Sequence, residues 1–172
     1  MRPSAILLGL LLFSSPLIAQ DIKPYESRAG KYKVMFPGKP EAKSTKLEDG
    51  ELNVASVPLG GGGFLVIYTD LGADKIKNIK PKEILSDGEK GLVDKFKAKI
   101  TSSKDIEFGK QKFPARELVG QAYIAEEAVT VDLRMTIILA DNRLYQIFVF
   151  GPKDLPKGKE ADKFFESFEI TN

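Results

Sequence analysis

The sequence predicts an α+β fold in which an antiparallel β-sheet is flanked by helices. Residues 129–151 alternate between apolar and polar side chains and then continue as an apolar run, which is typical of two paired strands. Residues 82–100 and 159–168 instead repeat apolar side chains at helical spacing. Short alternating segments bounded by glycine and proline surround the longer helical segment. Together these patterns favour one mainly antiparallel sheet with a few helices packed on it.

The hairpin predicted at residues 129–151 has a defined register. Asp141 and Asn142 tolerate positive φ angles, and they predict a two-residue type I′ turn between the strands. This turn places Ala140 opposite Arg143 and aligns the apolar side chains of both strands on one face. The second strand is apolar on both faces, so we expect it to be central in the sheet and covered on both sides.

Further strands are expected on either side of the longer helix. Residues 42–47 and 52–57 predict a hairpin through an Asp-Gly turn, and their weakly apolar composition favours a position near a sheet edge. The four glycines at 60–63 are interpreted as a flexible connection, because a strand follows them and not the helix that phosphate-binding loops require. The remaining strands are expected at residues 30–36, 64–68, 104–108 and 113–122.

The two predicted helices differ in regularity. Residues 82–100 contain Gly88 and Gly91, which each cost about 1 kcal/mol relative to alanine inside a helix. These glycines indicate either loose first turns or a close approach of the helix to the sheet. The helix at 159–168 carries a single apolar stripe that we expect to pack in the core, formed by Ala161, Phe164, Phe165 and Phe168.

The N-terminus predicts export. Residues 1–19 resemble a signal peptide, with Arg2 as its basic region, a short apolar run and Ala19 at the cleavage point. The apolar run is shorter than the roughly 20 residues of a membrane span, so no stable membrane insertion is expected after leader cleavage. We expect residues 20–29 to be a flexible segment and 30–172 to be a single domain. The expected location is periplasmic or extracellular.

The composition excludes several chemistries. The 172 residues include no cysteine and no histidine, which removes disulfides, thiolate nucleophiles, Ser-His-Asp catalysis and histidine-ligated zinc. The formal net charge of +2, together with export and the absence of tryptophan, argues against binding to nucleic acid. No cofactor is expected.

The order of elements resembles the PsbP-like family of α/β sandwiches, which includes the extrinsic photosystem II subunit, its bacterial relatives and a fold-related Ran-binding nuclear import factor. The segments that carry the resemblance are KYKVMFPGKPE, KFPARELVGQ, NRLYQIFVFGP and ADKFFESFEI. The chain is more similar to exported proteins of this fold from planctomycete-type bacteria. The resemblance implies a PsbP-like α/β/α sandwich, and it implies no catalytic residues because fold does not determine function.

The first functional hypothesis is an exported, non-catalytic binding or accessory module. Residues 75–112 contain eleven lysines and six acidic residues. Four of these lysines are closely spaced before and at the start of the predicted helix, and they are candidates for contact with an unknown protein or an anionic envelope component: Lys75, Lys77, Lys80 and Lys82. The alternative interpretation is a solvated charged face.

The second hypothesis is a carboxylate-based hydrolase, and a third is a small-ligand-binding protein of the cell envelope. Glu126 and Glu127 are adjacent acids, but neighbours on a strand point to opposite faces and make a poor acid/base pair. Asp132 and Arg134 are expected to pair with each other. Residues 48–51 are the one compact candidate for calcium, and they are better explained as a turn.

Overall fold

The computed structural model describes residues 24–47, 50–124 and 128–171. Seven strands form one antiparallel sheet: β3 (Glu41–Leu47), β4 (Gly50–Leu59), β5 (Gly62–Asp70), β6 (Lys99–Phe108), β7 (Phe113–Ile124), β8 (Val129–Ala140) and β9 (Arg143–Gly151). Their order across the sheet is β3-β4-β5-β9-β8-β7-β6. The predicted α+β class is therefore confirmed, and β9 is the central strand.

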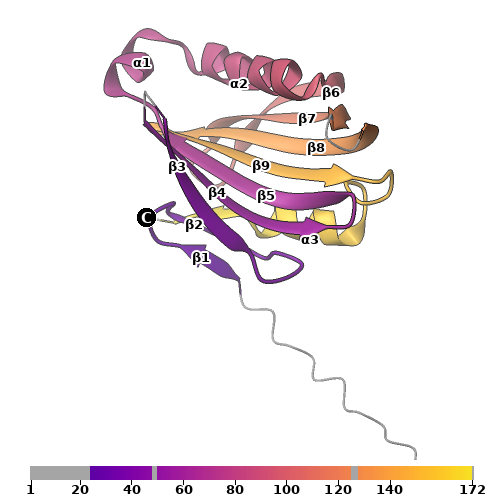
Figure 1. Ribbon diagram of the computed structural model, residues 1–172. Coiled ribbons are helices and arrows are strands. Elements are labelled where there is room, and N and C mark those ends of the chain that lie inside the picture. The colour runs from indigo at the N-terminus through magenta and orange to yellow at the C-terminus, as the bar shows by residue number, and fades with distance from the viewer. Residues whose placement is uncertain (1–23, 48–49, 125–127, 172) are drawn as a thin grey trace, which may run out of the picture.

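The remaining elements cover the two faces of this sheet. They are the helices α1 (Ala73–Asn78), α2 (Pro81–Phe96) and α3 (Lys159–Ser167), and the strands β1 (Tyr25–Ser27), β2 (Tyr32–Val34) and β10 (Glu169–Ile170). The three short strands form a second sheet in the order β1-β2-β10. Figure 1 shows α2 lying across one face of the large sheet, with α3 and the small sheet on the opposite side.

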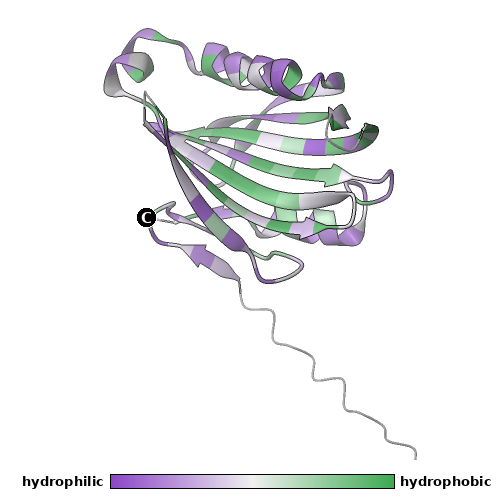
Figure 2. Cartoon of the chain, in the orientation of Figure 1, coloured by the Kyte–Doolittle hydropathy of each residue, from purple (hydrophilic) through white to green (hydrophobic). Residues whose placement is uncertain are grey.

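Two hydrophobic cores lie on the two faces of the large sheet. The core under α3 and the small sheet is rich in aromatic side chains, and its centre includes Tyr32, Phe64, Tyr145 and Phe164. The core under α2 is mainly aliphatic. In Figure 2 the most hydrophobic colouring follows the central strands, as expected for strands that pack on both sides.

The central hairpin has the register that the sequence predicts. Ala140 pairs with Arg143, and the alternating partners continue to Leu133 and Phe150. The turn type is different from the prediction. Asp141 has a φ of 53°, whereas Asn142 is outside the positive-φ region. A type I′ turn needs positive φ at both positions, so this connection is not type I′.

Several boundaries also differ from the sequence-based prediction: β5 begins at Gly62, so it includes two of the four glycines expected in a flexible connection, and β6 begins at Lys99 and not at residue 104. The long helix ends at Phe96, because Lys97 adopts a left-handed conformation with φ 45° and ψ 42°. Ile100 belongs to β6, where its side chain packs on the same core that a longer helix would have reached. Residues 25–27, expected in a flexible segment, form β1, and the ring of Tyr25 packs against aromatic rings of the small sheet and its flank. The signal-peptide segment lies outside the described residues.

Candidate functional site

A cleft of about 470 Å³ lies between α2 and the large sheet. Its floor comes from β4, β5 and β9, and its roof from α2 and the segment that leads into it. The apolar side chains that line it are Leu52, Ile67, Leu71, Ile79, Ile84, Leu92, Phe96 and Leu144. We call this cleft, together with the smaller pocket that adjoins it, the α2 cleft.

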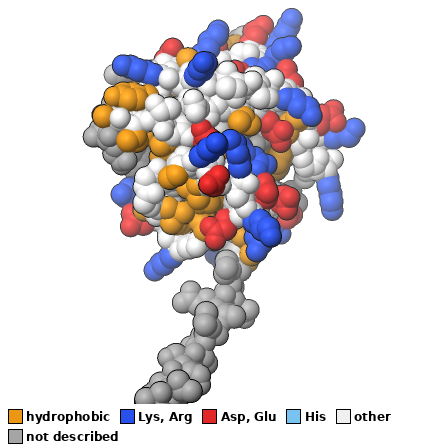
Figure 3. Space-filling model, turned by 90° about the vertical axis from the view of Figure 1, so that its right-hand side faces the viewer, with side chains coloured by type: hydrophobic (Ala, Val, Ile, Leu, Met, Phe, Trp, Pro, Cys, Tyr) orange, Lys and Arg blue, Asp and Glu red, His pale blue; other side chains and the backbone are white. Residues whose placement is uncertain are grey.

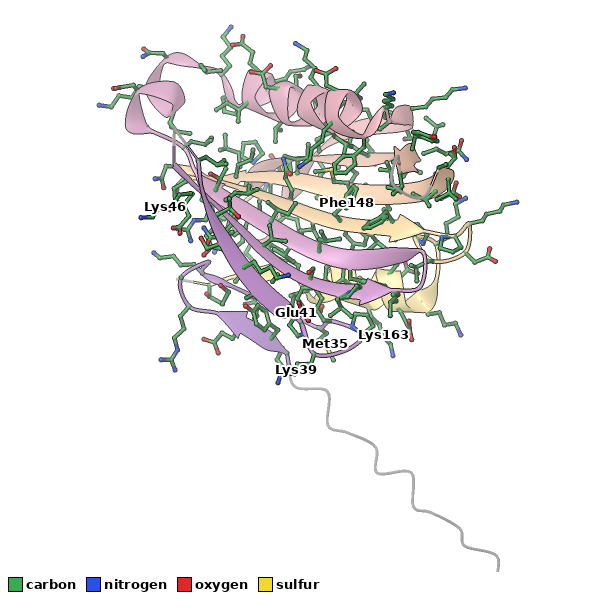
Figure 4. The ribbon with its side chains drawn as sticks, in the orientation of Figure 1. Met35, Lys39, Glu41, Lys46, Phe148 and Lys163 are labelled. Atoms are coloured by element: carbon green, nitrogen blue, oxygen red, sulfur yellow. The ribbon has the colours of Figure 1, made fainter. Side chains whose placement is uncertain are left out.

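The adjoining pocket is smaller, about 140 Å³. It shares four lining residues with the larger cleft: Ile67, Leu92, Phe96 and Gln146. Its other lining residues are Leu65, Ala122, Ile124, Met135, Phe148 and Phe150. In Figure 4, Phe148 lies on the sheet face below α2. Because the two spaces share lining side chains from both the helix and the sheet, they adjoin each other along α2.

The position of α2 on the sheet leaves one side of this cleft open. Phe96 is the last residue of the helix and contacts the ring of Phe148 on β9 with a centroid distance of 6.2 Å. The more numerous contacts of α2 are with β7 and β8, which lie on the β6 side of the sheet. Among the described helices, α2 therefore packs mainly away from β4 and β5, and Ile67 and Leu65 are only partly buried.

The polar contacts of Arg116 hold α2 on the β6 side. The Arg116 side chain is 8% exposed, and its guanidinium lies 2.6 Å from Asp105 on β6 and 2.9 Å from Glu89 on α2. It also donates to Ser86 Oγ at 3.0 Å. The contact with Arg116 lowers the pKa of Asp105, and the contact with Asp105 raises the pKa of Arg116. This network joins the helix to one edge of the sheet.

The two glycines of α2 shape the cleft. A Cβ atom at Gly88 would lie 3.3 Å from Ile137 Cδ1, so the helix approaches the sheet closely at this point. A Cβ at Gly91 would meet no atom within 4 Å. The close approach that the sequence allows is therefore present at Gly88, while Gly91 borders open space at the mouth of the cleft. Neither glycine interrupts the helix, which is continuous over Pro81–Phe96.

Gln146 is the polar group on the floor of the α2 cleft. It lies on β9 opposite Ile137, and its side chain lines both parts of the opening. Its side chain is partly buried. An apolar cleft with one such amide can hold an apolar ligand and orient a polar atom on it.

Two charged side chains stand at the mouth of the cleft. Asp87 and Lys95 are exposed, and they lie on the same side of α2 because they are spaced by two helical turns around Gly91. Asp87 is 3.7 Å from Lys90. Lys95 forms no ion pair with another described residue, and its Nζ lies 5.4 Å from the centre of the Phe96 ring.

The four lysines singled out from the sequence lie outside this cleft. Lys75 and Lys77 belong to α1, Lys80 directly precedes α2, and Lys82 is in its first turn. Lys77, Lys80 and Lys82 are exposed, and Lys82 Nζ is 3.7 Å from Asp105. Their role in binding stays a prediction. Figure 3 shows basic and acidic side chains interspersed over the end of the molecule that it presents.

The other candidate site residues from the sequence do not come together in one site. Glu126 and Glu127 lie outside the described residues, as do residues 48 and 49 of the calcium candidate. The predicted pairing of Asp132 with Arg134 is wrong. Arg134 reaches Asp162 on α3 at 2.6 Å, and Asp132 is 3.1 Å from Lys157. The helix α3 and the loop before it, which lie over that face, supply these closer partners.

The described residues provide neither a metal-binding cluster nor a membrane-spanning helix. They contain no group of three or more histidine, cysteine, aspartate or glutamate side chains placed to hold a metal ion. None of the described helices is long and apolar enough to cross a membrane.

The architecture defines a PsbP-like α+β fold. Its solved neighbours include CyanoP, the cyanobacterial PsbP of Synechocystis, with a TM-score of 0.60 and 11% sequence identity over 86% of this chain and 91% of that one. A putative regulator of unknown function from Pseudomonas aeruginosa gives a TM-score of 0.48 and 13% identity over 71% and 91%. No protein-family model and no curated protein sequence matches this chain. The likeness therefore extends to the fold alone.

Proposed function

We propose that this protein is an exported, non-catalytic binding module of the cell envelope, and that the α2 cleft is its binding site for a small apolar ligand. The observation that carries the proposal is the apolar cleft beneath α2, whose larger part measures about 470 Å³. Ligand sites in proteins are concave, mainly apolar and roughly 300–1,000 Å³ in volume, with a few polar groups that orient the ligand. Gln146 and Lys95 are such groups.

The titratable groups of the described residues support a binding role over a hydrolytic one. A general acid needs a carboxyl group with a raised pKa. The hydrogen bonds made by Asp70, Asp105 and Asp132 instead lower the pKa of each of these groups. Asp87, the acid at the cleft, is near Lys90 and exposed. Export is proposed from the leader at residues 1–19 and from the resemblance to exported proteins of this fold.

Replacing Gly91 with leucine tests the site. Gly91 lines the cleft and a Cβ there meets no atom within 4 Å, so a leucine has room to occupy the mouth, and we expect Nile red, a neutral hydrophobic dye, to bind about tenfold more weakly. That factor corresponds to losing the burial of roughly one apolar group. Dye fluorescence measured against protein concentration gives the affinity, and circular dichroism checks that the variant is folded.

Gly60→Leu is the matched control, because a Cβ at Gly60 in the β4–β5 turn also meets no atom within 4 Å and lies outside the cleft. This variant should bind Nile red like the wild type. Equal binding by a folded Gly91→Leu protein would contradict the assignment of the site.

A second candidate function uses the lysines at α1 and the start of α2. The exposure of Lys77, Lys80 and Lys82 favours contact with an anionic envelope component. Replacing these three and Lys75 with glutamate should abolish retention on anionic vesicles at moderate salt, measured by co-sedimentation. The Gly91→Leu variant serves as the control and should be retained like the wild type. Unchanged retention of the four-lysine variant would refute this function.

A further inference from the structure

We propose that the ligand of the α2 cleft is a single-chain amphipathic carboxylate whose head group is bound by Lys95. This inference rests on the proposed function, since it assigns a chemical class to the ligand of the same cleft. Three features of the described residues support it: the charges at the cleft mouth, the apolar lining opposite Gly91, and the position of Gln146.

The charges at the mouth favour an anionic head at one end. Asp87 and Lys95 stand two helical turns apart on the same side of α2. Asp87 has Lys90 as a neighbour at 3.7 Å, whereas Lys95 has no ion-pair partner among the described residues. An anionic group is therefore attracted to the Lys95 end, whereas the charge of Asp87 at the other end is balanced by Lys90. The carbonyl groups at the C-terminal end of α2 carry partial negative charge and weaken this attraction. The positive charge of the exposed Lys97, just beyond the helix, offsets their effect.

The type of cation favours a carboxylate. A lysine ammonium is a compact single positive charge, and a carboxylate carries one negative charge whereas a phosphate group carries up to two. One ammonium at the rim without an ion-pair partner among the described residues matches a ligand with one negative charge. The arginine nearest the helix, Arg116, already contacts Asp105, Glu89 and Ser86 and has no part in the lining.

The shape of the cleft favours one hydrocarbon chain. Between Lys95 and Ile84 the roof of the opening is formed by Leu92 and by the side-chain-free stretch at Gly91. An alkyl chain placed there lies against Ile67 and Leu144 on the floor. Gln146 lies between these apolar side chains and the inner pocket, so its amide can contact a polar atom near the head of the ligand.

Three probes with the same alkyl tail test the inference: dodecanoate, dodecanol and dodecylammonium. Displacement of Nile red at neutral pH and low salt gives their relative affinities. We expect dodecanoate to bind about fivefold more tightly than dodecanol, which is the effect of one exposed ion pair, and dodecylammonium to bind more weakly than either. High salt should remove the difference between dodecanoate and dodecanol because it screens the exposed charge of Lys95.

The variant that isolates the head group is Lys95→Gln, which removes the charge and retains most of the side chain. It should bind dodecanol like the wild type and lose the preference for dodecanoate. Lys163→Gln is the matched control, because Lys163 is an exposed lysine of α3 in the opposite layer (Figure 4). It should keep the preference.

The outcomes separate this inference from the proposed function. Equal affinity of wild-type protein for dodecanoate and dodecanol, or a preference that persists in Lys95→Gln, would overturn the carboxylate assignment and leave the cleft as an apolar site. Failure of all three probes to displace Nile red, or equal binding by Gly91→Leu, would overturn both. A preference for dodecanoate that is lost in Lys95→Gln and kept in Lys163→Gln supports both.

Discussion

Replacing Phe164 with alanine is expected to lower the free energy of unfolding by about 4 kcal/mol, the usual cost of removing a large aromatic side chain from a core. Phe164 is fully buried and lies at the centre of the core beneath α3. Its ring centre is 5.0 Å from that of Phe36 and 5.2 Å from that of Phe64. The substitution therefore leaves a cavity between the helix, the large sheet and the segment after β2. Urea denaturation followed by circular dichroism measures the loss.

Phe165 is the matched control on the same helix. It is only partly buried, and its ring lies under the guanidinium of Arg134 at 4.4 Å. Phe165→Ala should cost about 1–2 kcal/mol, since less apolar surface is lost and one cation–π contact is removed. Similar losses for the two variants would contradict the packing of α3. The Phe164→Ala protein should still bind Nile red under native conditions, because the α2 cleft lies on the opposite face.

Much of this fold follows from periodicity in the sequence. The alternation in residues 129–151 predicts both strands and their register, because a shift of one residue would move every apolar side chain to the other face. Where periodicity fails to predict the structure, the causes are local. Apolar spacing continues from Phe96 to Ile100, so periodicity alone does not reveal that Lys97 ends the helix in a left-handed conformation. The short strands β1 and β10 depend on pairing with β2, which their own residues do not encode.

The candidate site is harder to predict, because it depends on where α2 lies on the sheet. The sequence shows that both faces of residues 144–150 are apolar, and this pattern predicts a cover on both sides. The structure places α2 mainly over β7 and β8, so the cover is incomplete. One available signal was Gln146, a single amide within an apolar strand. A second was the four-residue spacing of Gly91 and Lys95, which places both on one side of a helix.

Replacing Arg116 with methionine is expected to lower the free energy of unfolding by about 2 kcal/mol. Breaking a buried ion pair costs roughly 3–5 kcal/mol, and the value here is smaller because the partner carboxylates keep access to water. Methionine retains the apolar stem of the side chain, so the loss reports mainly on the polar contacts. Arg28→Met is the control, because Arg28 is exposed in the turn before β2 and should change stability by less than about 0.5 kcal/mol. Urea denaturation near pH 7 measures both values.

The pH dependence of this loss identifies its electrostatic part. The contact with Arg116 holds the pKa of Asp105 below its ordinary value, so the contact stabilises the fold above the unfolded-state pKa of about 4 and is lost as pH falls through the folded-state pKa. The difference in the free energy of unfolding between wild type and Arg116→Met should therefore have its full value at pH 7 and become smaller below about pH 4. If the difference in the free energy of unfolding stayed constant down to acidic pH, the lost stability would come from packing and not from the ion pairs. Because Arg116 joins α2 to β6 and β7, the variant should also bind Nile red with altered affinity at pH 7, and unchanged affinity would show that the cleft does not depend on this anchor.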